Sequence, residues 1–293
     1  FVYDEAGTEY LDLYGGHAVI SVGHSHPHYV NRLEEQLNKI AFYSNAVENP
    51  LQQQLADEIG DQSCLHDYQL FLCSSGAEAN ENALKLASFH TGKKRILAFK
   101  NAFHGRTSAA VAATDNQNIN APLNQQQEVT FIPFNDLEAL ENELKKGDVC
   151  GVIFEPIQGV GGLDIPDDEF VLGMNALCEK YNTCLIADEV QSGFSRSGTF
   201  FAFQQNNIKP HVITMAKGMG NGFPIGGILV HPDLKPKYGM LGTTFGGNHL
   251  ACTASLAVLE IIKKDNLQQH AKKMDTYFRS KAEKIKGAKR FIP

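Results

Sequence analysis

Short apolar runs alternate along the chain with longer stretches that have helical spacing. Several of the short runs are apolar throughout, which is typical of strands covered on both faces of a mostly parallel sheet. The runs that predict strands are 70–73, 95–99, 129–133, 149–155, 184–188, 212–215 and 227–230. The stretches that predict helices are 76–90, 136–146, 169–181 and 248–263. This pattern predicts an α/β fold with helices flanking a mostly parallel sheet.

Three of the predicted strands have an ionisable residue at their carboxyl end. Run 149–155 ends at Glu155, run 184–188 ends at Asp188, and run 212–215 stops just before Lys217. Ligands of open α/β sheets bind beyond the carboxyl ends of the strands. Two carboxylates and a lysine at equivalent strand ends therefore predict one shared site.

Lys217 lies between small residues and is followed by the glycine-rich segment 218–222. For an isolated Lys-Gly pair, a solvated loop lysine is the ordinary interpretation. Here the glycines allow close approach of the backbone to a ligand, and a lysine withdrawn from water can attack an aldehyde. The glycines do not have the G-x-G-x-x-G spacing, so a dinucleotide site is disfavoured.

Asp188 closes an apolar run, so its carboxylate needs a cationic partner if it is withdrawn from water. The protonated ring nitrogen of a pyridoxal cofactor is such a partner, and its protonation makes the ring an electron sink. The alternative is that Asp188 only caps the turn that follows.

Two further segments have the residue types of a cofactor site. Ser75 and Glu78 have capping-box spacing, and the small first turn of the helix that they begin is a candidate phosphate site; a plain capping box is the alternative. Phe103 offers a flat face to a ring and Arg106 a guanidinium to a carboxylate, although an isolated arginine is ordinarily a surface residue.

The histidines at 24, 26 and 28 are candidate metal ligands because of their close spacing. Pro27 interrupts a regular strand there, and no cluster of cysteine or carboxylate side chains completes the set. We therefore expect no metal.

Composition narrows the class of protein. The 293 residues are 43% hydrophobic, enough for one large domain and a smaller one. A net charge of −7 without a basic run argues against nucleic-acid and anionic-membrane partners, and no apolar stretch approaches the ~20 residues of a membrane span. The six cysteines form no CxxC pair, which favours a reducing, cytoplasmic compartment.

We expect three segments in the chain. Residues 1–47 form an N-terminal segment with part of a small α+β domain, 48–264 form the large cofactor-binding domain, and 265–293 begin the C-terminal small domain. The chain begins at Phe1 rather than at a methionine, and we expect it to be a fragment of a longer protein.

Taken in order, the motifs resemble those of the class-III, fold-type-I pyridoxal-phosphate (PLP) aminotransferases. Each motif is weak alone, but eight in sequence along almost the whole chain are specific, and within the family the acylornithine enzymes are the most similar. The motifs lie at 10–12, 23–27, 75–81, 103–107, 155–159, 188–193, 216–218 and 243–248.

The resemblance implies a PLP site. Lys217 is implied to hold the cofactor covalently and to move the proton at the substrate carbon, and Asp188 to pair with the ring nitrogen. The implied ring and phosphate contacts are Phe103 and Val190 on the two ring faces, Gln191 on the ring hydroxyl, and Ser75, Gly76 and Ala77 around the phosphate. Thr244 is implied to reach the phosphate of a neighbouring subunit, hence a homodimer.

The resemblance also implies a substrate site and a reaction. Arg106 would bind the α-carboxylate of an N-acylornithine (acetyl or succinyl), and Glu155, His17 and Val160 belong to the same substrate site. Relatives usually have a glutamate at the place of Val160 and an aliphatic residue at that of His17. The distal amine would pass to 2-oxoglutarate, giving a semialdehyde and glutamate in arginine biosynthesis. The alternatives are another ω-aminotransferase (ornithine, 4-aminobutyrate or a diamine), a PLP aminomutase, or an inactive truncated relative.

Overall fold

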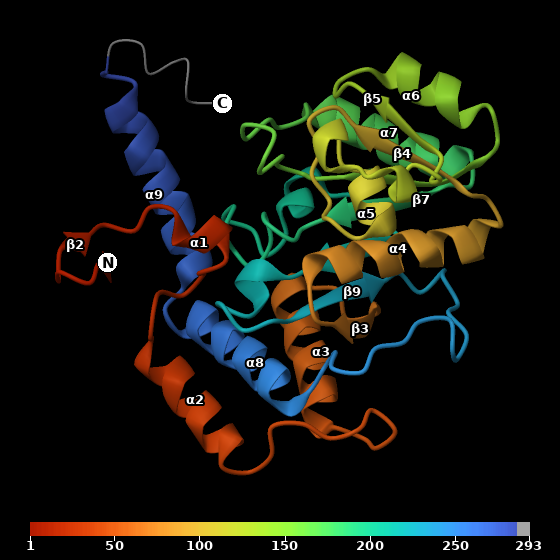
Figure 1. Cartoon of the computed structure of the whole chain (residues 1–293). Helices are drawn as coiled ribbons and strands as arrows, with labels where there is room; N and C mark the ends of the chain where they lie inside the picture. Colours follow the sequence, from red (N-terminus) through yellow and green to blue (C-terminus); the bar gives the residue numbers. More distant parts are fainter. Residues whose placement is uncertain (286–293) are drawn as a thin grey trace.

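A seven-stranded sheet forms the centre of the computed structural model, which describes residues 1–285 (Figure 1). The strand order is β3-β9-β8-β7-β6-β4-β5. Neighbours from β8 to β5 are parallel, whereas β9 is antiparallel to both β8 and β3. The strands are β3 (Gln69–Cys73), β4 (Arg95–Phe99), β5 (Val129–Ile132), β6 (Val149–Phe154), β7 (Cys184–Asp188), β8 (Val212–Met215) and β9 (Gly226–Val230). The predicted mostly parallel α/β sheet is confirmed.

Strands β6, β7 and β8 are buried along their whole length because both faces of the sheet are covered. Successive residues of one strand belong to opposite cores: Leu185 packs with one apolar cluster and Ile186 with the other. This explains why these runs are apolar throughout. Phe154 lies opposite Ala187, and Asp188 opposite Thr214, so the three strands end at the same edge of the sheet.

Helices cover both faces of the sheet. Helix α4 packs against β6, β8 and β9 on one face, and α7 packs against β7 (Figure 1). Helix α8 packs against α2 and α3. The main helices are α2 (Pro27–Leu37), α3 (Pro50–Ser63), α4 (Gly76–Thr91), α6 (Leu137–Leu144), α7 (Asp168–Lys180), α8 (His249–Lys264) and α9 (Leu267–Ala282). The four predicted helices are α4, α6, α7 and α8.

Helices α2 and α3 were not predicted, and both begin with a proline. Pro27 and Pro50 occupy the first turn, where the missing N–H has no intrahelical partner to lose. The Asn49 side chain caps α3 by accepting a hydrogen bond from the backbone N–H of Leu51. Pro27 therefore starts a helix here.

The remaining elements are short and peripheral. They include α1 (Gly15–Ala18), α5 (Ser108–Ala112) and the antiparallel pair β1 (Val2–Tyr3) and β2 (Glu9–Tyr10). Between residues 1 and 285, no helix is both long and apolar enough to cross a bilayer. Residues 286–293 of the expected C-terminal segment lie outside the described residues.

Candidate active site

Lys217 lies two residues beyond β8, at the start of a short 3-10 helix, η4 (Lys217–Met219). Its Nζ atom donates a hydrogen bond to Gln191 Oε1 at 2.9 Å. Burial lowers the pKa of the Lys217 ammonium, and the nearby charges of Asp188 and Glu155 act in the opposite direction. The backbone φ of Lys217 is 40°, in the left-handed region that non-glycine residues rarely adopt. Such strain is typical of functional sites.

Asp188 is the last residue of β7, and only 4% of it is exposed. Its Oδ2 atom accepts hydrogen bonds from Asn80 Nδ2 at 2.8 Å and from His104 Nδ1 at 2.7 Å. Its Oδ1 atom accepts one from the backbone N–H of Val190 at 3.1 Å. Asp188 therefore does bond the turn that follows, and it is also a buried carboxylate close enough to Lys217 to influence its charge.

Glu155 follows β6 and is buried at the same edge of the sheet. Its Oε1 accepts a hydrogen bond from the N–H of Phe103 at 2.9 Å, and its Oε2 one from Gly159 at 3.0 Å. Burial raises the pKa of this carboxyl group. Glu155 thereby holds the backbone of Phe103 and of the segment that leads to Val160.

The first turn of α4 packs against the loop that follows β7. Ser75 caps the helix by accepting a hydrogen bond from the N–H of Glu78 at 3.2 Å; the Glu78 carboxylate accepts one from Ser74. A Cβ on Gly76 would lie 2.7 Å from Cγ1 of Val190. Glycine at 76 is therefore required by packing against Val190, whether or not the turn holds a phosphate.

Four of the predicted site residues are exposed and are joined to this cluster by no hydrogen bond or ion pair within residues 1–285. They are Arg106, His17, Val160 and Thr244. Val160 is 65% exposed, and the His17 ring lies 5.0 Å from that of Tyr14.

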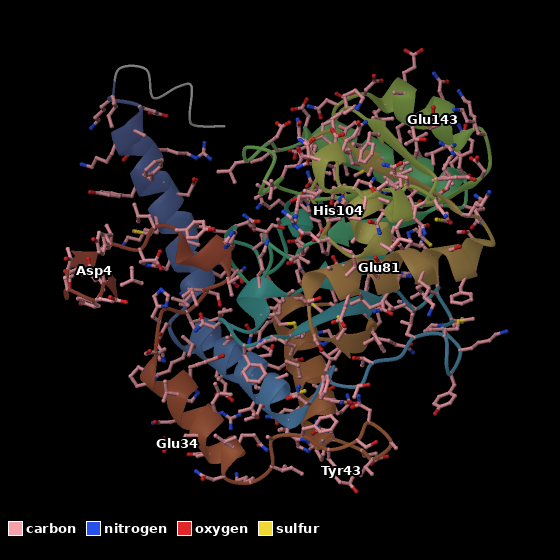
Figure 2. All side chains as sticks on the ribbon, in the orientation of Figure 1. Asp4, Glu34, Tyr43, Glu81, His104 and Glu143 are labelled. Atoms are coloured by element: carbon pink, nitrogen blue, oxygen red, sulfur yellow. The ribbon has the colours of Figure 1, made fainter. Side chains whose placement is uncertain are left out.

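Two residues in contact with Asp188 were missed by the sequence interpretation. They are Asn80, on α4, and His104, whose side chain is fully buried. Figure 2 shows His104 near the centre of the molecule, close to α4. The available signal was Asn80 itself, a poor helix former placed within a helical pattern.

The histidines near residue 26 have different partners. His24 Nε2 lies 2.7 Å from Asp12, whereas His28 bonds Glu260 on α8. Their side chains are thus used to hold segments of the fold together.

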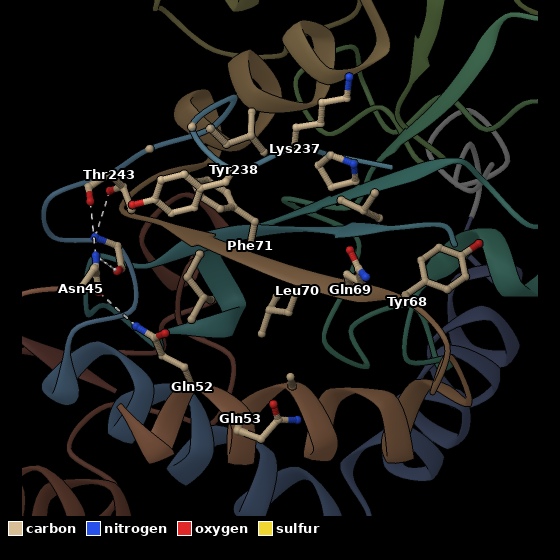
Figure 3. Close-up of a pocket in the computed structure, with 18 residues that line it drawn as sticks. Asn45, Gln52, Gln53, Tyr68, Gln69, Leu70, Phe71, Lys237, Tyr238 and Thr243 are labelled. Atoms are coloured by element: carbon tan, nitrogen blue, oxygen red, sulfur yellow. Dashed lines mark hydrogen bonds between the residues drawn. The ribbon is translucent and has the colours of Figure 1, made fainter. Parts of the chain in front are cut away.

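A separate hollow of about 850 Å³ lies along the edge strand β3 (Figure 3). Its lining comes from β3, from α3 and from the loop around Tyr238 and Thr243, and it includes none of the predicted site residues. Asn45 Nδ2 holds this loop through the carbonyl oxygens of Thr243 and Gly246, each at 3.2 Å.

Comparison with known proteins identifies the family. The model of the family "Aminotransferase class-III" matches residues 1–293. The chain belongs to the class-III aminotransferases. An acetylornithine aminotransferase of Halalkalibacterium halodurans is 42% identical over 272 residues, 92% of this chain and 70% of the relative. One of Archaeoglobus fulgidus is 42% identical over 281 residues, 95% of this chain and 74% of the relative.

A solved structure confirms the fold-type-I architecture. Taurine:2-oxoglutarate aminotransferase from Bifidobacterium kashiwanohense, in complex with PLP and glutamate, superimposes with a TM-score of 0.89 at 27% identity. The alignment covers 96% of this chain and 70% of that structure. The class-III chain described here is a PLP-dependent aminotransferase.

The residues at the carboxyl edge fit PLP. A half-buried lysine lies close to a buried carboxylate, as an amine that holds the cofactor and a partner for its ring nitrogen require. Within residues 1–285, Asp188 Oδ1 accepts one hydrogen bond, from the Val190 N–H, which leaves an acceptor position for the protonated ring nitrogen of PLP.

Proposed function

We propose that this aminotransferase transfers the distal amino group of an N-acylornithine, acetylated or succinylated, to 2-oxoglutarate. The products are the semialdehyde and glutamate, and the pathway is arginine biosynthesis. The observation that carries the chemistry is the half-buried Lys217 at the strand ends beside Asp188. The choice of substrate is supported by the acetylornithine aminotransferases at 37–42% identity.

Residues of the strand ends bind and orient PLP in this proposal. When bound, the cofactor supplies an electron sink for the charge that develops at the substrate carbon. Lys217 Nζ would hold it covalently and, once displaced by the incoming amine, would carry the proton from that carbon to the cofactor; burial supports this role because it favours the neutral amine. Asp188 holds the proton on the ring nitrogen.

The other cofactor contacts follow from the loops around Lys217. Gln191 binds the ring hydroxyl, and its position beside Lys217 Nζ supports this. Val190 and Phe103 cover the two ring faces, and the N-terminus of α4 at Ser75, Gly76 and Ala77 holds the phosphate.

The substrate lies on the solvent side of this cluster. Arg106 binds its α-carboxylate; its exposure and its lack of an ionic partner within residues 1–285 support that role. Val160 and His17 line the acyl side. Glu155 positions the Phe103 backbone and the segment before Val160, as its two backbone hydrogen bonds suggest.

The proposed assembly is a homodimer in which Thr244 reaches the phosphate of the neighbouring subunit. Thr244 is exposed and its loop is held by Asn45. The next residue, Phe245, is 62% exposed and pairs with Phe42 at a ring distance of 5.5 Å. An exposed aromatic pair beside Thr244 is typical of an interface.

The division into segments 1–47, 48–264 and 265–293 remains a proposal, as does a cytoplasmic location. The boundary at 264 coincides with the end of α8, and that at 47 precedes α3. All six cysteines are unpaired, which supports a reducing compartment.

The decisive experiment is a screen of amino donors with the purified PLP-loaded protein. Spectra show which amines convert the PLP form to the pyridoxamine form. N-acetylornithine and N-succinylornithine should react faster than ornithine, 4-aminobutyrate or simple diamines. A faster reaction with ornithine or 4-aminobutyrate would favour the alternative ω-aminotransferase. Failure to release glutamate when 2-oxoglutarate is added would favour an aminomutase.

A further inference from the structure

Two buried side chains, on the interior side of Asp188, donate hydrogen bonds to its carboxylate. His104 lies in the loop after β4, and Asn80 is on the second turn of α4. Each donates a hydrogen bond to the same atom, Asp188 Oδ2, at 2.7 and 2.8 Å. The exposed fraction is 2% for His104, 1% for Asn80 and 4% for Asp188, so water does not compete for these bonds.

The two donors are themselves connected. Asn80 Nδ2 also donates to the carbonyl oxygen of His104 at 2.7 Å, and the His104 N–H donates to Thr114 Oγ1 at 2.9 Å. Two acceptors on Nδ2 fix the orientation of the Asn80 amide. The backbone of His104 is thus held between α4 and Thr114 by bonds that involve no ligand.

The protonation pattern follows from the partners. An ionised Asp188 can only accept, so His104 must carry its proton on Nδ1. Nε2 is buried and has no partner within residues 1–285, so the hydrogen bond that the ring makes there is the one that Nδ1 donates to Asp188. The hydrogen bonds from His104 and Asn80 stabilise the negative charge of Asp188.

The hydrogen bonds to Asp188 leave one of its oxygen atoms able to bind a ligand. A carboxylate has about four such positions, two on each oxygen. Asn80 and His104 fill those of Oδ2, and the Val190 N–H takes one on Oδ1. One position on Oδ1 remains.

We infer that His104 and Asn80 are positioning residues that hold Asp188 ionised and oriented, so that the proton shared with the cofactor ring stays on the ring nitrogen. The inference deepens the proposed function and rests on the proposed role of Asp188. Asn80 and the proposed phosphate site both belong to α4. This helix would therefore fix the position of the cofactor phosphate relative to Asp188, the partner of the ring nitrogen.

The test uses the protein loaded with PLP that is ¹⁵N-labelled at the ring nitrogen. The chemical shift of this nitrogen shows whether it carries the proton, and a spectral titration gives the PLP dissociation constant. His104→Phe keeps a ring but removes the donor, and Asn80→Leu keeps the shape but removes the amide. Each should move the shift towards the unprotonated value and raise the dissociation constant about tenfold, or about 1.4 kcal/mol.

Two variants act as controls. His104→Asn restores an N–H donor close to the place of Nδ1 and should return the shift most of the way to the wild-type value. His211→Phe alters another histidine, at the opposite end of β7, where it bonds the Leu185 N–H. It should lower thermal stability and leave the ring-nitrogen shift unchanged.

Asp188→Asn separates failure of this inference from failure of the proposed function. If Asp188→Asn deprotonates the ring nitrogen while His104→Phe and Asn80→Leu retain the wild-type shift, the inference is overturned and the role of Asp188 stands. If Asp188→Asn also retains it, the proposed role of Asp188 fails and the inference fails with it. Should His104→Phe not fold, Asn80→Leu and His104→Asn decide the matter.

Discussion

The Nζ atom of Lys217 donates a hydrogen bond to Oε1 of Gln191, 2.9 Å away, between the loops that follow β8 and β7. Gln191 in turn packs against the loop after β6, because a Cβ on Gly159 would lie 2.3 Å from its side chain. The loops that follow three adjacent strands are therefore in contact through Gln191. The sequence predicted that these strand ends lie together.

Lys217 is the residue on which the proposed chemistry depends. Borohydride reduction of the PLP-loaded protein should fix the cofactor on the peptide that contains Lys217, since this amine lies at the strand ends and burial lowers its pKa. Peptide mass analysis locates the label. Label on another lysine, with Lys217 unmodified, would show that Lys217 does not hold the cofactor. The Lys217→Arg variant is the control and should incorporate no label.

Asp188→Ala removes the proposed partner of the ring nitrogen. Loss of a buried charge partner costs ~3–5 kcal/mol, so turnover should fall by at least about a hundredfold. The measurement is kcat with the best amino donor, with circular dichroism to show that the variant is folded. Near-normal turnover in a folded variant would show that the ring nitrogen is stabilised by another group.

Glu189 is expected to make the fold less stable as the pH rises. It is fully buried, and burial raises its pKa to about 7 from the ordinary 4.5, against the hydrogen bonds from Ser192 and Phe203. The folded state thus binds the proton more tightly than the unfolded state. The resulting stability is complete below pH 4.5 and is lost as the pH rises to about 7.

Glu189→Gln should flatten this dependence. At ~1.4 kcal/mol per pKa unit, the contribution amounts to roughly 3 kcal/mol across the window. The amide preserves both contacts, because its oxygen accepts from Phe203 and its nitrogen can donate to Ser192. Urea denaturation between pH 5 and 8 gives the free energies of unfolding. Parallel wild-type and variant curves would mean that Glu189 does not titrate in this range.

Much of the central sheet follows from local pattern. The runs 184–188 and 212–215 match β7 and β8 residue for residue, because a strand covered on both faces must be apolar throughout. The direction of β9 does not follow from pattern, since an antiparallel neighbour has the same apolar residues as a parallel one. Its pairing depends on contacts between distant segments, such as Gly226 with Ser75.

Some residues of the candidate site can also be predicted from local pattern, and others cannot. Lys217 and Asp188 are visible in the sequence because ionisable residues at the ends of apolar runs are unusual. His104 and Asn80 are not, because their role depends on a tertiary contact with a residue 84 or 108 positions away. The prolines at 27 and 50 were informative signals of helix starts, which the interpretation of Pro27 as a strand breaker overlooked.

Arg106→Lys tests recognition of the α-carboxylate. A guanidinium binds a carboxylate with two parallel hydrogen bonds, and an ammonium does not reproduce that geometry. The efficiency with an acylornithine should fall about tenfold or more, while a primary amine without a carboxylate loses little. First-half-reaction rates with the two donors give the comparison. An equal loss for both would indicate a structural arginine.

Val160 is expected to select the acyl group. It is 65% exposed and follows Gly159, whose N–H is held by Glu155, so its side chain is presented from a fixed backbone. The resemblance implies a glutamate at this place in relatives. Valine carries no charge that would repel an acyl carboxylate, and its apolar side chain tolerates an acyl chain beside it. A succinylated ornithine should therefore react at least as well as an acetylated one.

Val160→Glu should shift this preference by charge repulsion. Two like charges about 4 Å apart in a largely solvated site repel by ~1 kcal/mol or more, so use of the succinyl substrate should fall about fivefold, with less effect on the acetyl substrate. Val160→Gln has the same shape without the charge and controls for bulk. The measured quantity is the ratio of first-half-reaction efficiencies for the two donors, at low and high salt because screening weakens the repulsion. If the glutamate and glutamine variants give the same ratio, the charge at 160 does not reach the acyl group, and the preference must be set elsewhere in the site.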